Sequence, residues 1–287
     1  MTTPIFCMIK TWSTSVRYEA RNVVPCALCG GTDFAAYLQC EGFAYVRCRR
    51  CSLAQMNPQP DAEAVSRRYG GEDYLEYELA NEKSFLNLAL LALADAGFYG
   101  YESSLCPVER RSLDVGCATG ALAGWLRERG WQAEGVEINS WQAEYARRER
   151  GLSVYGKPLE ENALERGGYT LITAFHLIEH LRRPRAFLAE TRRLLAPGGR
   201  LLLITPNCGG FQARLFKGRW RSAIFDHLYL FSVQTLTSLL EQEGFTVNKS
   251  VTWGGLAAGI APKPVKTVFD RLAKHFGFGD VMLVSAC

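Results

Sequence analysis

The stretch Leu113-Asp114-Val115-Gly116-Cys117-Ala118-Thr119-Gly120 decides the fold of this chain. The apolar residues at 112–116 predict a short buried strand, and residues 120–129 predict the helix that follows it. Glycines in the turn between them let a ligand approach the backbone, and the start of the helix offers free N–H groups to an anionic group of that ligand. The turn lacks the G-x-G-x-x-G spacing of dinucleotide sites, so no pyrophosphate is indicated.

Strand and helix patterns alternate after this turn. Strands are predicted over 133–138, 152–155, 169–175 and 200–205. Helices are predicted over 140–149, 184–196 and 232–243, the second ending before Pro197-Gly198-Gly199. Continuous apolar strands are typical of a parallel sheet that is covered on both faces. The expected fold class is therefore α/β, with a Rossmann-like, doubly wound, mostly parallel sheet.

Two further strands are predicted near the end of the chain, over 245–251 and 280–286, with a loop rich in Gly, Ala and Pro between them. We expect them to form an antiparallel pair at one edge of the sheet.

Glu137, at the end of the strand 133–138, lies seventeen residues beyond Gly120. An acidic side chain there can accept both hydrogen bonds of a ribose diol.

Two cysteine pairs near the N-terminus indicate a metal site. Cys26-Ala-Leu-Cys29 and Cys48-Arg-Arg-Cys51 are separated by eighteen residues. Two such turns complete a tetrahedral shell of four thiolates, which is typical of structural Zn²⁺. The metal would supply folding energy that a module of about 40 residues cannot obtain from its own core. The alternatives are two redox motifs or two disulfides.

The chain divides into three predicted parts. Residues 1–60 form an N-terminal leader, over 1–22, and a small zinc ribbon; residues 61–104 form a helical connector or lid; residues 105–287 form the Rossmann-like domain. The net charge of +4 does not mark a nucleic-acid or membrane partner. The most apolar stretch is about half as long as a membrane span, and the N-terminus lacks a signal-peptide pattern, so we expect a cytoplasmic protein.

Four blocks of sequence resemble the class I S-adenosylmethionine-dependent methyltransferases. They are LDVGCATG (113–120), GVEIN (135–139), ITAFHLIEHL (172–181) and RRLLAPGGRLLLITPN (192–207). They occur in the family's order, and the resemblance covers roughly residues 105–250. The cysteine pairs and the ending GDVMLVSA resemble a bacterial subgroup with an N-terminal four-cysteine zinc ribbon, whose members commonly act in sugar, polysaccharide or related small-molecule pathways.

The resemblance implies S-adenosylmethionine as the cofactor. It assigns Asp114, Gly116 and Gly120, with Cys117 between them, to the methionine end. It assigns Glu137 to the ribose, counts the neighbouring Ile138 among the cofactor-binding residues, and places Leu159 and Glu160 near the adenine. Tyr74 belongs to a segment, 69–77, that resembles a lid over the cofactor. The chain departs from the family pattern at Ala118, where a second glycine is usual, and at Lys157, near where an acidic residue often contacts adenine.

Candidate catalytic residues follow the strand 169–175, at the carboxyl edge where α/β sheets bind substrates: His176, Glu179 and His180. Three interpretations compete. His-x-x-Glu-His is a pattern of some zinc peptidases, Glu179 and His180 can brace the loop, or an imidazole can act as a general base, with His180 the leading candidate and His227 the next. The chain also resembles small-RNA 2′-O-methyltransferases and ubiquinone O-methyltransferases, in which similar Glu-His segments can bind a divalent metal. His227 would complete the ligand set of such a metal here.

The sequence favours transfer of a methyl group to a hydroxyl or carbon of a small metabolite, with a sugar or sugar nucleotide as the leading acceptor. Basic residues 214–221 offer contacts to an anionic acceptor, or form a solvated loop. One alternative is an RNA methyltransferase that grips its substrate with the ribbon. The ribbon carries few basic residues beyond Arg47, Arg49 and Arg50, so nucleic acid is not the expected partner. The other alternative is a catalytically silent binding protein.

Overall fold

The computed structural model describes residues 23–61, 72–256 and 262–287. Two sheets organise them, one of seven strands in the order β10-β11-β8-β7-β4-β5-β6 and one of four in the order β1-β2-β3-β9. The large sheet consists of β4 (Arg111–Val115), β5 (Gln132–Val136), β6 (Ser153–Tyr155), β7 (Tyr169–Phe175), β8 (Leu195–Pro206), β10 (Val247–Trp253) and β11 (Val281–Ala286). The predicted leader (1–22) lies outside the described residues.

The large sheet is parallel from β6 to β8 and antiparallel at β11 and β10. The mostly parallel Rossmann-like sheet and the antiparallel pair are thus confirmed. Strand order runs outward in one direction from β4 to β6 and in the other from β7 to β8. Ligands of open α/β sheets bind at the carboxyl ends of the strands beside such a reversal, so the site is expected where β4 and β7 end.

Helices cover both faces of this sheet, as its apolar strands require. Leu201 and Leu203 of β8 belong to a core shared with α6 (Pro184–Leu194) and α8 (Val233–Gln242). Leu202 and Ile204 belong to a second core, on the opposite face. That core is shared with α2 (Glu72–Asp95), α3 (Phe98–Ser104), α4 (Ala121–Glu128) and α5 (Ser140–Arg150).

Three details differ from the sequence prediction. The helix over 184–196 ends at Leu194, and β8 already begins at Leu195, because Pro197-Gly198-Gly199 forms an irregularity within the strand. The predicted loop between the last two strands contains α9 (Lys263–Phe276), which has a single buried residue, Ala273. A short helix, α7 (Phe211–Phe216), follows β8. None of the described helices has both the length and the apolar character of a membrane span.

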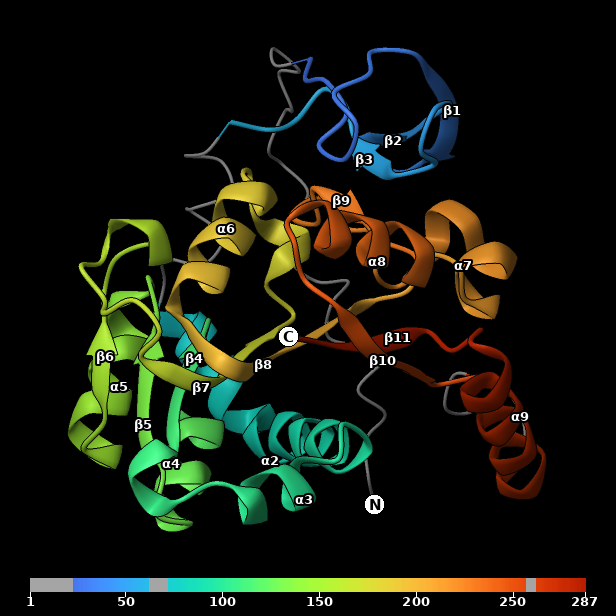
Figure 1. Cartoon of the computed structure of the whole chain (residues 1–287). Helices are drawn as coiled ribbons and strands as arrows, with labels where there is room; N and C mark the ends of the chain where they lie inside the picture. Colours follow the sequence, from blue (N-terminus) through green and yellow to red (C-terminus); the bar gives the residue numbers. More distant parts are fainter. Residues whose placement is uncertain (1–22, 62–71, 257–261) are drawn as a thin grey trace.

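The N-terminal ribbon, residues 23–60, contributes β1 (Phe34–Gln39), β2 (Ala44–Cys48) and β3 (Ala54–Met56). Its sheet is completed by β9 (Tyr229–Leu230), which comes from the loop after α7. Figure 1 shows the ribbon beside β9 and α8 at one end of the molecule. Leu28 and Leu53 are buried in the same core as the strands of the large sheet. The ribbon is therefore packed into the molecule and is not an appendage.

Candidate functional site

The glycine turn connects β4 to α4. Gly116 and Gly120 have φ values of 75° and 77°, which glycine adopts without strain. A Cβ atom on Gly120 would lie 2.5 Å from Leu152 Cδ1, so a side chain there would also have to displace Leu152. Ala118, where the resembling family usually has glycine, has a φ of 47° and takes the same left-handed conformation. The turn therefore keeps the expected backbone path despite this departure.

Two buried carboxyl groups lie behind the turn. Glu137 accepts hydrogen bonds from Ala118 N at 3.0 Å and from Asn139 N at 2.8 Å. The backbone N–H of Ile138 also stabilises this carboxylate, and a carboxylate can accept about four hydrogen bonds, so capacity remains for a ligand. Asp114 accepts from the Thr173 hydroxyl at 2.6 Å. Burial, reinforced by the charge of Glu137, raises the pKa of Asp114 to about 6.

The other predicted cofactor residues differ in how far their side chains are buried. Cys117 is buried under β5, where a Cβ on Gly135 would lie 2.5 Å from its Sγ. Ile138 is 67% exposed although it follows a buried strand. Leu159 is buried and Glu160 half-buried in a 3₁₀ turn, Leu159–Glu161, after β6. An exposed isoleucine beside Glu137 offers an apolar surface that a planar ligand group can cover.

Helix α2 is tied to the glycine turn. The Glu82 carboxylate accepts hydrogen bonds from Thr119 Oγ1 and from Arg150 Nη2, both at 2.6 Å. Arg150 Nε also donates to Thr119 O at 2.8 Å. Glu82 therefore joins the connector to the turn and to α5, a role that the sequence prediction missed.

Tyr74 lies about two turns before Glu82 on α2, and Glu78 lies about one turn before it. Burial raises the pKa of Tyr74, and the charges of Glu78, Asp226 and Glu137 act in the same direction. Burial and the charge of Glu137 raise the pKa of Glu78 to about 7. The i, i+4 spacing of residues 74, 78 and 82 is a sequence signal for one helix face, and it marks Glu78 as a further acid near the predicted ribose carboxylate.

Beyond β7, the chain makes a tight turn that directs two predicted catalytic residues together. His176 has a φ of 52°, uncommon for a residue other than glycine, and a 3₁₀ turn, Ile178–His180, follows. His176 Nδ1 lies 3.5 Å from Glu179 Oε1, and Thr205 Oγ1 donates to Glu179 Oε2 at 2.9 Å. The Glu179 side chain is 1% exposed and that of His176 is 40% exposed.

His180 and His227 meet beside this carboxylate. Their ring centroids are 4.7 Å apart, and a ligand atom from each imidazole and from Glu179 all lie within 4.8 Å of one another. His180 Nδ1 is 2.9 Å from Asp226 O, and His227 Nδ1 is 2.8 Å from Ser222 O. A carbonyl oxygen only accepts, so both Nδ1 atoms are donors, and in the neutral rings both Nε2 atoms keep their lone pairs.

The charges of this cluster follow from its contacts. Burial disfavours ionisation of Glu179, but the polar contact with His176 and the charges of His180 and His227 lower its pKa to about 2. Burial, aided by His180, lowers the pKa of His227 to about 4. At neutral pH the cluster thus combines a carboxylate with a neutral His227.

The basic residues between positions 214 and 221 differ in their contacts: one is bound to a buried acid and the others are exposed. Arg221 Nε donates to the buried Asp280 at 2.5 Å, and Trp220 Nε1 donates to the other oxygen of that carboxylate at 2.5 Å. Arg221 is therefore committed to anchoring the loop. Arg214, Lys217 and Arg219 are exposed.

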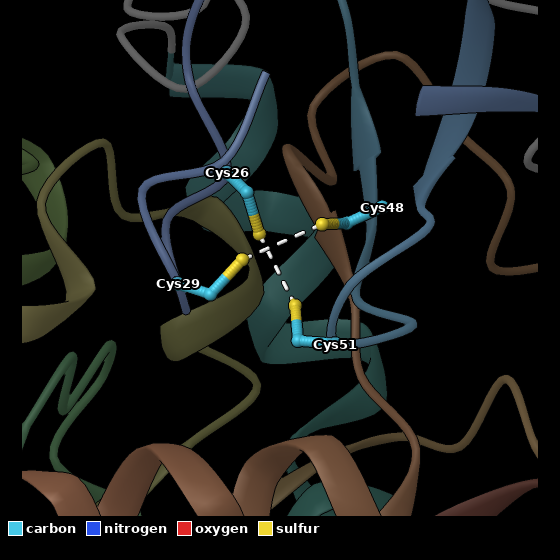
Figure 2. A group of neighbouring side chains, drawn as sticks. All are labelled: Cys26, Cys29, Cys48 and Cys51. Carbon is cyan, nitrogen blue, oxygen red and sulfur yellow. Dashed lines mark hydrogen bonds between the residues drawn. The ribbon is translucent and has the colours of Figure 1, made fainter. Parts of the chain in front are cut away.

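The four predicted metal-binding cysteines converge on one point (Figure 2). Cys26 Sγ is 3.3 Å from Cys51 Sγ, Cys29 Sγ is 3.5 Å from Cys48 Sγ, and all four sulfur atoms lie within 4.8 Å of one another. None forms a disulfide. In a tetrahedral zinc site with Zn–S distances of about 2.3 Å, the sulfur atoms are about 3.8 Å apart. The arrangement fits four thiolates around one zinc ion.

Two matching backbone turns present these sulfur atoms. Gly30 N donates to Cys26 O at 2.8 Å, and Ser52 N donates to Cys48 O at 2.9 Å. Gly30 and Ser52 both have positive φ, 69° and 66°. The first turn thus has glycine at this position, where positive φ carries no strain, whereas the second places serine in the same conformation.

A family model described as a methyltransferase domain matches residues 82–250. Among curated proteins, the ubiquinone biosynthesis O-methyltransferase of Methylococcus capsulatus is 32% identical over 104 residues, 34% of this chain and 44% of the relative. The protein of the same name from Klebsiella pneumoniae is 27% identical over 154 residues, 52% of this chain and 60% of the relative. The matches thus span less than two thirds of these relatives.

Solved structures share the fold. A Thermotoga maritima protein, described as an S-adenosylmethionine-dependent methyltransferase and possible histamine N-methyltransferase, superimposes with a TM-score of 0.55. The match covers 78% of this chain and 97% of that protein at 21% identity. At this identity the likeness supports the fold, including the sheet whose carboxyl edge carries the glycine turn.

Proposed function

We propose that this chain, which belongs to the S-adenosylmethionine-dependent methyltransferases, methylates a hydroxyl group of a small-molecule acceptor. One observation carries the choice of a hydroxyl: Glu179, His180 and His227 present their ligand atoms within 4.8 Å of one another at the carboxyl edge of the sheet. A hydroxyl must lose its proton during methylation, and imidazoles and a carboxylate can promote that loss.

Two acceptor classes are consistent with this chemistry. The resemblance to the ribbon-bearing subgroup favours a sugar or sugar nucleotide, and exposed Arg214, Lys217 and Arg219 offer contacts to its phosphate groups. The curated relatives are named for ubiquinone biosynthesis and for O-methylation. The names of these relatives favour oxygen as the acceptor atom, and we take the sugar class as the first to test.

The ribbon's arginines favour a small molecule over RNA. Arg47 lies over the Tyr37 ring, 3.8 Å from its centroid, and Arg49 Nε is 3.3 Å from Asp33 Oδ1. These contacts occupy two of the three arginines that would form a basic face on the ribbon. A nucleic-acid surface normally presents a broader basic patch.

The cofactor is expected across the ends of β4 and β5. Glu137 would accept hydrogen bonds from the ribose hydroxyls with the capacity left on its two oxygens. The turn from Gly116 to Gly120 would face the methionine end, with Ile138 and Leu159 toward the adenine and Tyr74 above. S-adenosylmethionine supplies a methyl group activated on a sulfonium, so the protein mainly aligns the acceptor and removes its proton.

The cluster of Glu179, His180 and His227 fits a divalent cation. Glu179 Oε1 is buried, and its contact with His176 Nδ1 is long, at 3.5 Å, so this oxygen keeps capacity for a cation. Both histidines donate Nδ1–H to backbone carbonyls, the arrangement that orients Nε2 toward a metal. A bound cation would acidify an acceptor hydroxyl.

The proton would go to His176. Its imidazole is the most exposed of the three and is oriented by Glu179. As the acceptor oxygen forms its bond to the methyl carbon, the carbon–sulfur bond breaks with its electron pair left on sulfur. The acceptor proton moves to the imidazole nitrogen, so charge and atoms balance.

We also propose that Cys26, Cys29, Cys48 and Cys51 hold one structural Zn²⁺. Four sulfur ligands leave no open coordination position, which argues for a structural role.

The function is tested by incubating the protein with methyl-labelled S-adenosylmethionine and a cell metabolite extract, then identifying the labelled product. We expect a labelled O-methyl compound. Once it is known, His176→Gln should lower turnover about 10²–10⁴-fold with little change in cofactor affinity. Glu190→Gln, an acid on α6 paired with Arg193, serves as the matched control. A wild-type protein that binds no cofactor would support the silent binding protein instead.

A further inference from the structure

The ribbon is built into the loop that carries His227. Gln55 pairs with Tyr229 and Ala54 with Leu230, so β9 is a strand of the ribbon's own sheet. Met56 N also donates to Leu228 O at 2.8 Å. Backbone bonds from the ribbon therefore fix the chain directly after His227.

A second contact fixes the chain at His227 itself. The Tyr45 hydroxyl, on β2, lies 2.8 Å from Ile224 O and 2.8 Å from His227 O. Tyr45 is 1% exposed, and burial raises the pKa of its hydroxyl well above the usual range, so it remains a donor. Its single hydrogen is shared between two carbonyls of one loop, so it holds both ends of the turn that precedes His227.

Aromatic packing supports the same contact. The Phe43 ring meets the Tyr45 ring edge-on at 5.9 Å and the Phe225 ring at 6.1 Å. The ribbon thus contacts the loop on both sides of Asp226, whose carbonyl accepts from His180. The imidazole of His227 is held separately, by Ser222 O. Ring and main chain of His227 consequently have independent anchors, and the main-chain anchor comes from the ribbon.

We propose that Tyr45 is a positioning residue through which the ribbon aligns His227 with Glu179 and His180. The inference rests on the proposed role of that cluster. It gives the ribbon a function other than substrate binding: it is a brace for the reaction centre. Loss of the hydroxyl leaves two buried carbonyls without this donor and lets the loop shift, while the cofactor residues at β4 and β5 are untouched.

The test compares Tyr45→Phe with Tyr37→Phe. Tyr37 lies on neighbouring β1 and its ring packs on Arg47, so the control removes a hydroxyl from the same sheet without touching residues 224–228. Mn²⁺ is the probe, because it prefers carboxylate and imidazole ligands and competes poorly for thiolates. Titration is followed by the electron paramagnetic resonance signal of free Mn²⁺, with cofactor affinity measured in parallel.

We expect Tyr45→Phe to weaken Mn²⁺ binding about 10- to 100-fold, the range for residues that orient metal ligands, and to leave cofactor affinity unchanged. Tyr37→Phe should change neither. A second readout needs no metal: the backbone ¹⁵N–H resonance of His227 should match wild type in the control and should shift in Tyr45→Phe, because the hydroxyl contacts the main chain of residues 224 and 227.

If Tyr45→Phe and Tyr37→Phe have the same Mn²⁺ affinity and the same His227 resonances, Tyr45 does not position His227 and the proposal is wrong. If wild type binds no Mn²⁺, the proposed cation site fails, and the His227 resonances alone decide the role of Tyr45. If Tyr45→Phe does not fold, Phe43→Leu keeps the hydroxyl but removes the aromatic support. It should then produce a smaller change in the same His227 resonances, and unchanged resonances would refute the proposal.

Discussion

At the residue scale, four acids near the site differ because their surroundings differ. Burial outweighs one hydroxyl donor at each of two acids, raising the pKa of Asp114 to about 6 and that of Glu78 to about 7. Glu179 is more completely buried than either, yet contacts with imidazoles lower its pKa to about 2. Glu137 meets three backbone N–H groups, those of Ala118, Ile138 and Asn139, which oppose the upward effect of burial on its pKa. Burial therefore sets the direction of the pKa shift only where nearby charges and donors do not override it.

Glu137→Ala should weaken cofactor binding by the loss of one or two charge-assisted hydrogen bonds, about 1.5–3 kcal/mol each. Titration calorimetry on the folded variant measures this. Glu165→Ala is the control, because Glu165 is an exposed acid paired only at 3.3 Å with Arg111 at the other end of β4. Unchanged affinity in Glu137→Ala would remove Glu137 from the cofactor site.

Asp114 should make stability fall as pH rises. Its folded pKa, about 6, exceeds an unfolded value of about 3.9, so the folded state binds more protons between about pH 4 and 6. Wild type should therefore lose about 2–3 kcal/mol across this window relative to Asp114→Asn, which cannot titrate. Urea unfolding at pH 4 and pH 6.5 gives the difference. If the free energy of unfolding changed equally with pH in the two proteins, the pKa of Asp114 would not be raised by folding.

At the element scale, short connections between elements shape the site more than the elements themselves. The Glu82 carboxylate holds α2 against the glycine turn and α5. Two cysteine turns with the same backbone conformation bring four sulfur atoms together. In each case a few hydrogen bonds orient groups that lie far apart in the sequence.

Cys29→Ser should release the proposed zinc and lower stability, because the shell loses one thiolate. Cofactor binding should persist below the lowered melting temperature, since the cofactor residues lie at β4 and β5. Metal content by mass spectrometry and cofactor titration provide the two measurements, with exposed Cys106→Ser as control. A metal-free wild type with Cys26 linked to Cys29 would refute the zinc site.

At the scale of the whole molecule, the ribbon and the large sheet share one core. Leu28 and Leu53 of the ribbon are buried with Leu113 and Leu203 of the sheet. Arg185 of α6 adds polar contacts, since its guanidinium donates to Ala27 O at 2.9 Å and to Leu28 O. The expected domain boundary at residue 60 therefore does not separate two cores.

Wild-type protein should consequently unfold in a single thermal transition, because structures that share a core lose it together. Differential scanning calorimetry should give equal calorimetric and van't Hoff enthalpies. Strands β1–β3 and β9 should also lose hydrogen-exchange protection together with β8. A separate low-temperature transition confined to the ribbon would show that it folds as an independent unit.

The sequence by itself determined the sheet, the glycine turn and the cysteine site. The spacing of apolar residues and the positions of glycines are local properties of the sequence. The strand predicted over residues 169–175 therefore has the same bounds as β7. The four cysteines could be grouped because their spacing limits how two tight turns can close. The helix α9 was missed, since flanking Gly and Pro residues obscured its pattern and it buries little apolar surface.

Only the tertiary structure decided how these parts meet. Tyr45 and His227 are 182 residues apart, and no local pattern links them, yet the hydroxyl of one lies 2.8 Å from the carbonyl of the other. The convergence of Glu179, His180 and His227 likewise depends on where the loop after β8 is held. Sequence patterns record which face of an element is buried, whereas contacts between distant segments are selected by the packing of the whole chain.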